Sequence, residues 1–183
     1  MRHLLATTIS LALLVCAVPA HSQNFALKQN FPDRKAVVIN NATPSLTLSD
    51  FSFTNEYRDR STKGVTMLKW TNTGDKAITA FEVVILYYDP FNRPMSQGGR
   101  WLIPGHDSAN WTPLNPGESA TDGTIGFTDS DAYTGIVYVR AIRFSDGTVW
   151  SSNQAQLETR IKTELPQLRE IGTLDPGPKK AAQ

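Results

Sequence analysis

The chain has 183 residues, with 18 Lys or Arg, 17 Asp or Glu and a single Cys. This length fits one domain with its own hydrophobic core. The near-neutral charge disfavours nucleic acid as the main partner, and a lone Cys excludes a disulfide framework and a thiolate metal cluster.

The first 22 residues are typical of a secretory signal peptide. Arg2 and His3 precede an apolar run over residues 4–18, and small residues follow. This run is shorter than the roughly 20 residues that a membrane-spanning helix needs. We expect cleavage after Ser22, with Ala20 as the alternative position, and export to the periplasm or the cell exterior without a stable membrane span.

Removal of residues 1–22 changes the charge and the cysteine count. This segment contains Arg2 and no acidic residue, so 17 basic and 17 acidic residues remain. It also contains Cys16, which would anchor a lipoprotein, but Val15 stands before it where a small residue is expected. An exported domain without Cys must be stabilised by burial and backbone pairing, so we expect a domain with a full core.

Beyond residue 35 the apolar pattern has a period of two, which is typical of β-strands. Leu46 and Leu48 alternate with polar residues, and Phe51 and Phe53 alternate in the opposite phase. This change of phase predicts a β-bulge near Ser49.

The strongest strand pattern runs from Ile78 to Tyr88. It is apolar on both faces apart from Glu82, which predicts a central strand covered on both sides. Other strands are expected near residues 36–39, 46–53, 65–72, 100–103, 119–127 and 136–144, with a hairpin over 144–150. Closely spaced turn signals with no interposed helices predict an antiparallel β-sandwich.

The pattern changes after residue 150. Ser151 and Gln154 form a capping-box pattern, and Leu157, Ile161 and Leu165 then recur every four residues. These features predict a C-terminal amphipathic helix. Its apolar stripe is expected to lie on the sandwich or, alternatively, to bind a partner chain.

Three segments carry a resemblance to a known class. They are Asn72-Thr73-Gly74-Asp75 after a strand, the strand end Leu86-Tyr87-Tyr88, and Leu114-Asn115-Pro116-Gly117 before another strand. Residues 64–150 thereby resemble the immunoglobulin-like sandwich modules of bacterial envelope and secreted proteins, of the CARDB and FxLYD types. The resemblance implies an all-β, immunoglobulin-like antiparallel β-sandwich. By analogy it also implies a non-catalytic module for adhesion, spacing or docking to another envelope or extracellular protein.

Large aromatic residues in turn-rich segments suggest an alternative function. Trp101, Trp111 and Tyr133 lie where alternating core positions do not readily explain them, and exposed rings can stack on sugars. The chain could therefore be a carbohydrate-binding module that uses these three residues. The competing interpretation is that the rings cover the ends of the sandwich core.

The sequence offers little support for catalysis or for a cofactor. A hydrolase would have to use His106, and the chain lacks the motif of a nucleophile elbow or of a phosphate-binding loop. Asp122, Asp129 and Asp131 could supply oxygen ligands to calcium, but solvated turns explain them equally well. We expect no enzyme activity, no cofactor and no metal, with a protein or a glycan as the partner.

These patterns divide the chain into five parts. They are a signal peptide at 1–22, an extended lead-in at 23–35, a β-sandwich at 36–150, a helix at 151–171 and a disordered tail at 172–183.

Overall fold

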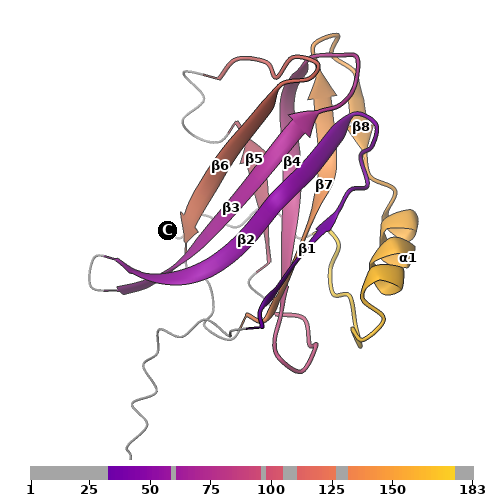
Figure 1. Ribbon diagram of the computed structural model, residues 1–183. Coiled ribbons are helices and arrows are strands. Elements are labelled where there is room, and N and C mark those ends of the chain that lie inside the picture. The colour runs from indigo at the N-terminus through magenta and orange to yellow at the C-terminus, as the bar shows by residue number, and fades with distance from the viewer. Residues whose placement is uncertain (1–32, 59–60, 96–97, 105–110, 127–131, 176–183) are drawn as a thin grey trace, which may run out of the picture.

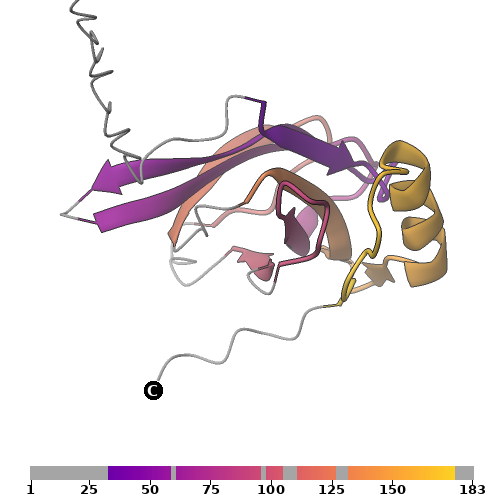
Figure 2. The same cartoon turned by 90° about the horizontal axis from the view of Figure 1, so that it is seen from below.

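The computed structural model describes residues 33–58, 61–95, 98–104, 111–126 and 132–175. These residues form β-strands β1 to β8, arranged in two sheets, and the helix α1 (Figure 1). Seen from below, the sheets form two layers and α1 lies outside both (Figure 2). The described chain is therefore all-β apart from one helix and sandwich-like, in agreement with the strand periodicity. The expected signal peptide lies outside the described residues.

The large sheet has the strand order β1-β7-β4-β5. β1 and β8 both pair with the same edge of β7, one after the other along that strand. All pairs in this sheet are antiparallel except β1 with β7, which is parallel. The expectation of a purely antiparallel sandwich is therefore wrong for the first strand. The bounds are β1 Lys35–Ile39, β4 Ile78–Tyr88, β5 Gly99–Ile103, β7 Thr134–Phe144 and β8 Val149–Ser151.

The small sheet has the order β2-β3-β6, with β2 Leu46–Arg58, β3 Ser61–Asn72 and β6 Ser119–Gly126. The pairing of β2 with β3 shifts register between Ser49 and Ser52, and Asp50 has a φ of 50°. This shift confirms the predicted β-bulge. It brings Leu48 and Phe51 to the same buried face despite their opposite phases in the sequence.

The main core lies between the two sheets. Trp70 of β3 is 1% exposed, and its ring centroid lies 5.3 Å from that of Phe81 and 5.9 Å from that of Trp101. β4 lies between β5 and β7, and both of its faces are buried over most of its length. The prediction of a central strand covered on both sides is confirmed.

Two consecutive asparagines connect β1 to both sheets. The side-chain amide of Asn40 donates to the carbonyl of Leu48 in β2 at 3.1 Å and accepts from its N–H at 2.7 Å. The amide of Asn41 does the same for Val139 in β7, at 2.7 and 3.0 Å. Each side-chain amide therefore replaces the backbone of a neighbouring strand, because it pairs with one N–H and one carbonyl at the edge of a strand.

The helix α1 spans Gln154–Glu164, which is shorter than the expected range of 151–171. Its N-cap is Asn153, whose side chain accepts from the N–H of Gln156 at 3.1 Å. Ser151 is not the cap, because it belongs to β8 and pairs with Ala141.

The apolar stripe of the helix lies on the chain's own large sheet. Leu157, Ile161 and Leu165 are all buried in a second core, on the face of the sheet that points away from the small sheet. The sheet residues of this second core include Val84, Leu86, Ile136 and Tyr138. The three helix residues are consequently covered within this chain, and the alternative in which they bind a partner is wrong.

Residues 165–175, which we call the C-terminal strap, continue across the same face of the large sheet. The Tyr88 hydroxyl donates to the Ile171 carbonyl at 2.6 Å, and the Tyr138 hydroxyl donates to the Leu174 carbonyl. Residues 172–175 were expected to begin a disordered tail. They are instead held on the sheet by these contacts and by an ion pair of Asp175.

Candidate functional site

The outer face of the large sheet is covered over only part of its length. The second core and the strap cover the part around Val84 and Tyr138. The opposite part carries exposed and half-buried side chains, because residues next to core positions on a strand point to the other face. We call this part the open face, and it comprises Glu82, Arg100, Leu102, Arg140, Arg143 and Val149.

Two aliphatic side chains are exposed on the open face. Leu102 of β5 is 51% exposed and Val149 of β8 is 59% exposed. Because β4 and β7 separate these strands, the spacing of neighbouring strands places the two residues roughly 15 Å apart. They therefore fall within the area of a single protein–protein interface.

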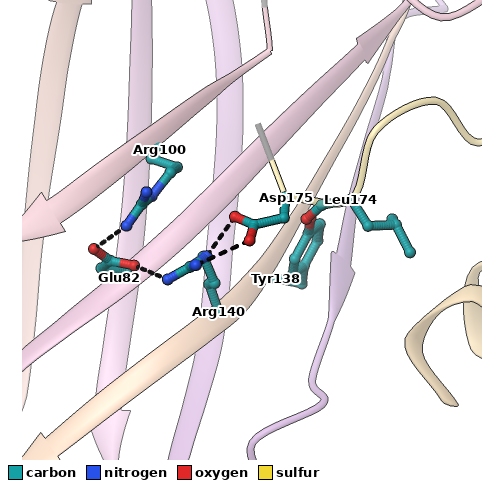
Figure 3. Close-up of polar contacts among 6 residues, drawn as sticks. All are labelled: Glu82, Arg100, Tyr138, Arg140, Leu174 and Asp175. Atoms are coloured by element: carbon teal, nitrogen blue, oxygen red, sulfur yellow. Dashed lines mark hydrogen bonds and ion pairs between the residues drawn. The ribbon is translucent and has the colours of Figure 1, made fainter. Parts of the chain in front are cut away.

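A chain of ion pairs crosses the open face from β5 to the strap (Figure 3). Glu82 of β4 accepts from Arg100 Nη2 at 2.5 Å and from Arg140 Nη1 at 2.7 Å, using a different carboxylate oxygen for each. Arg140 also binds Asp175 in a bidentate manner, with Nε to Oδ1 at 2.6 Å and Nη2 to Oδ2 at 2.9 Å. Four segments of the chain thus supply one alternating row of charges.

The charge states of the strap contacts follow from their partners. The hydrogen bond from Arg140 holds the pKa of Asp175 below its usual range, and the same contact raises the pKa of the Arg140 guanidinium. Burial raises the pKa of Tyr88 to about 12, and burial likewise raises the pKa of Tyr138. At neutral pH the strap is therefore held by one ion pair and two neutral phenol donors.

The three aromatic residues expected to bind sugars do not form one surface. Trp101 packs edge-on against Trp70 beside the main core, and the indole of Trp111 donates to the Thr79 carbonyl at 2.9 Å. The Tyr133 hydroxyl donates to Asp33 at 2.5 Å. The backbone N–H of Tyr133 donates to the carbonyl of Tyr88, at the opposite end of β4 from Thr79. Trp111 and Tyr133 therefore lie roughly 30 Å apart along that strand.

The residues that were considered for catalysis or for calcium, and set aside, are placed only in part. His106, Asp129 and Asp131 lie outside the described residues. Asp122 is exposed on β6, where its carboxylate accepts from the N–H of Gly123 at 2.7 Å. Within the described ranges, no three His, Cys, Asp or Glu side chains are grouped so that they could hold a metal ion.

Sequence reasoning assigned no function to the residues of the charge row, although two of them interrupt apolar strand patterns. Glu82 is the single charged residue in an otherwise apolar central strand, and Arg140 likewise interrupts the apolar pattern of β7. Opposite charges at such positions can mark neighbouring strands, because cross-strand pairs of opposite charge are favourable. Asp175 gave no signal, since its partner is 35 residues away in sequence.

Comparisons with known proteins give no family. No family model matches the chain, and no curated protein matches it. It is similar to the solved structure of a hypothetical protein from Peptoclostridium difficile 630, with 15% identity and a TM-score of 0.49 over 67% of this chain and 92% of that one. It is also similar to a protein described as ApaA from Bordetella pertussis, with 17% identity and a TM-score of 0.36 over 57% of this chain and 84% of that one. No helix in the described part of the chain is long and apolar enough to cross a membrane.

Proposed function

We propose that this chain is an exported, non-catalytic interaction module of the immunoglobulin-like type, and that it docks another envelope or extracellular protein through the open face. The observation that carries this proposal is the exposure of Leu102 and Val149 on a sheet face that the chain covers elsewhere with its own helix and strap. An uncovered sheet face that combines aliphatic and arginine side chains is suited to binding a protein.

The composition of the open face supports a protein as the partner. Arg100 lies beside Leu102 on β5, and Arg140 and Arg143 lie on β7, between the two aliphatic side chains. Arginine is enriched at protein interfaces. The ion pairs with Glu82 hold two of these guanidinium groups in place, so docking need not order them. The matching partner surface has an acidic centre with an apolar position on either side of it.

The exported location and the immunoglobulin-like type are inferred from the sequence. The amino-terminal segment has the order of charges, apolar run and small residues of a signal peptide, and the remaining chain has no Cys. Two packed sheets with turns at the ends of β3 and before β6 agree with the resemblance of residues 64–150 to immunoglobulin-like modules.

Site-specific photo-crosslinking in the source cells tests the docking proposal. A crosslinking amino acid at position 102 or 149 should give one discrete adduct, because both positions lie in the contact area. The matched control is position 91, since Phe91 is 67% exposed but belongs to the loop after β4. Adducts of equal yield from all three positions, or none from 102 and 149, would contradict docking at this face.

A charge reversal separates specific docking from chance contact. Arg143→Glu places an acid opposite the acidic centre of the partner surface and should abolish the adduct formed from position 102. Arg93→Glu reverses a charge in the loop after β4 and should leave that adduct unchanged. Loss of the adduct in both variants would indicate a nonspecific electrostatic effect.

A further inference from the structure

A separate hollow lies at the edge of the large sheet, where α1, β8 and the connection from β1 to β2 meet. Its volume is about 320 Å³, within the range of sites for small ligands. The residues that define it here are Asn41, Thr43, Trp150, Ser151, Gln156 and Arg160. They come from two parts of the sequence, 41–43 and 150–160, and none of them belongs to the open face.

The walls of this hollow are fixed by contacts within the chain. The Asn41 amide is held by both backbone groups of Val139, and Arg160 Nη1 donates to the Asn40 carbonyl at 2.7 Å. Leu157, beneath the helix, is 2% exposed. A site with its walls already in place loses little conformational entropy when a ligand binds.

The side chains of the hollow suit a ligand rich in hydroxyl groups. Thr43 and Ser151 contribute hydroxyls and Gln156 contributes an amide, and all three are exposed. Each of these groups can both donate and accept, as a sugar hydroxyl can. The half-buried Trp150 ring adds an apolar wall against which the C–H face of a sugar ring can pack.

Arg160 gives the hollow its charge. It is the one charged side chain among the described residues that line the hollow, and its contact with Asn40 uses one of its five N–H donors. The remaining donors of a guanidinium group match the two oxygens of a carboxylate. The ligand is therefore expected to carry a carboxylate beside its hydroxyl groups.

The hollow adjoins a second one, so that together they can hold more than a single small ligand. A second, more open hollow on α1 is lined by Ala155, Gln156, Thr159 and Arg160, so it shares Gln156 and Arg160 with the first. The two hollows lie on either side of these shared residues. This arrangement favours an oligosaccharide over a single acid.

We propose that the hollow at Trp150 and Arg160 binds a saccharide that contains uronic acid, with Arg160 holding the carboxylate and the Trp150 ring lying against the sugar. Titration calorimetry with an oligogalacturonate of three units, using the full exported chain, should show saturable binding with a Kd below about 1 mM. The neutral galactose oligomer of the same length should bind at least about tenfold more weakly, because charge-assisted hydrogen bonds are the stronger ones.

Two variants assign this binding to the hollow. Arg160→Gln removes the charge and should weaken oligogalacturonate binding at least about tenfold. Lys162→Gln removes the same charge from the same helix, but Lys162 pairs with Glu158 and lines neither hollow. Its effect should stay below about twofold, as expected for an exposed charge outside the site.

A third variant keeps the proposal testable if Arg160→Gln disturbs the fold. Gln156→Glu places an acid in the first turn of α1, which favours the helix, but it should abolish binding by repelling the carboxylate. Thermal unfolding of each variant checks the fold. The proposal is overturned if the wild-type chain does not bind oligogalacturonate, if it binds the neutral oligomer equally well or an acidic peptide more tightly, or if Lys162→Gln weakens binding as much as Arg160→Gln.

Discussion

Asn41 shows how a single side chain can complete a β-sheet. β7 pairs with β1 up to Tyr138 and with β8 from Ala141, and Val139 lies between these two stretches on the same edge. A side-chain amide carries one donor and one acceptor, as a peptide group does. Asn41 therefore satisfies both backbone groups of Val139, which would otherwise be buried without partners at a considerable cost.

The substitution Asn41→Ala should lower the free energy of unfolding by about 2 kcal/mol or more, since it leaves one N–H and one carbonyl of β7 without partners. Urea denaturation of the variant and of the wild-type chain measures this difference. Asn115→Ala is the matched control, because Asn115 is exposed in the turn before β6, and it should cost below about 1 kcal/mol. Equal losses in the two variants would show that the Asn41 contacts are not a special source of stability.

At the residue scale, a short sequence pattern predicts only those features that depend on neighbouring residues. The β-bulge at Ser49 could be predicted, because a change of phase between neighbouring apolar pairs is visible in a few residues. The role of Asn41 could not, since asparagine beside a strand ordinarily indicates a turn and its partner Val139 is 98 residues away. For Trp101 and Trp111 the sequence offered two interpretations, sugar binding and covering of the core, and both rings pack against the main core.

At the scale of elements, the start of α1 is decided by competition between two structures. Ser151 and Gln154 fit a capping box, but the backbone of Ser151 is already paired with Ala141 in β8. Ser152 is still held beside β7, since its N–H donates to the Arg140 carbonyl. Asn153 follows it, and its ψ of 113° is that of an N-cap. The strand therefore moves the start of the helix toward the C-terminus.

Substitution of the two candidate caps separates these interpretations. Asn153→Ala should lower the free energy of unfolding by about 1 kcal/mol, because it leaves the Gln156 N–H without its acceptor. Ser151→Ala should change it by less than about 0.5 kcal/mol, because Ser151 enters the ladder through its backbone. Chemical denaturation of both variants provides the comparison. A larger loss for Ser151→Ala would restore the capping box that the sequence suggests.

The types of the elements could be predicted more fully than their arrangement. Nearly continuous apolar runs define β4 and β7 almost to their ends, because a strand buried on both faces needs that pattern. No such pattern specifies a parallel partner for β1. Its five residues are compatible with any free strand edge, and its pairing with β7 depends on the whole fold.

At the scale of the whole molecule, α1 and the strap act as a third layer on the large sheet. Val84, Leu86 and Ile136 form a second apolar face, and the residues after β8 cover it. The chain therefore buries two cores with one sheet between them. The interaction surface proposed above lies where this third layer ends.

Deletion of residues 152–183 should destabilise the sandwich, because it uncovers the second core, rather than leave a folded domain that only fails to associate. We expect a lower midpoint of thermal unfolding and binding of an apolar dye, as for a protein with exposed core residues. A chain that ends at residue 175 is the matched control, since it retains α1 and the strap. An unchanged midpoint in the shorter chain would show that the third layer contributes little.

The parallel pairing of β1 with β7 has a consequence for the time at which the sandwich can close. Lys35 pairs with Thr134, so about 100 residues separate the first strand from its partner. At ordinary rates of protein synthesis, β1 waits about 5–20 s before β7 has been made. Contacts of such long range also slow folding. Among the described strands, β1 leaves the ribosome first and is consequently among the last to pair with its neighbour.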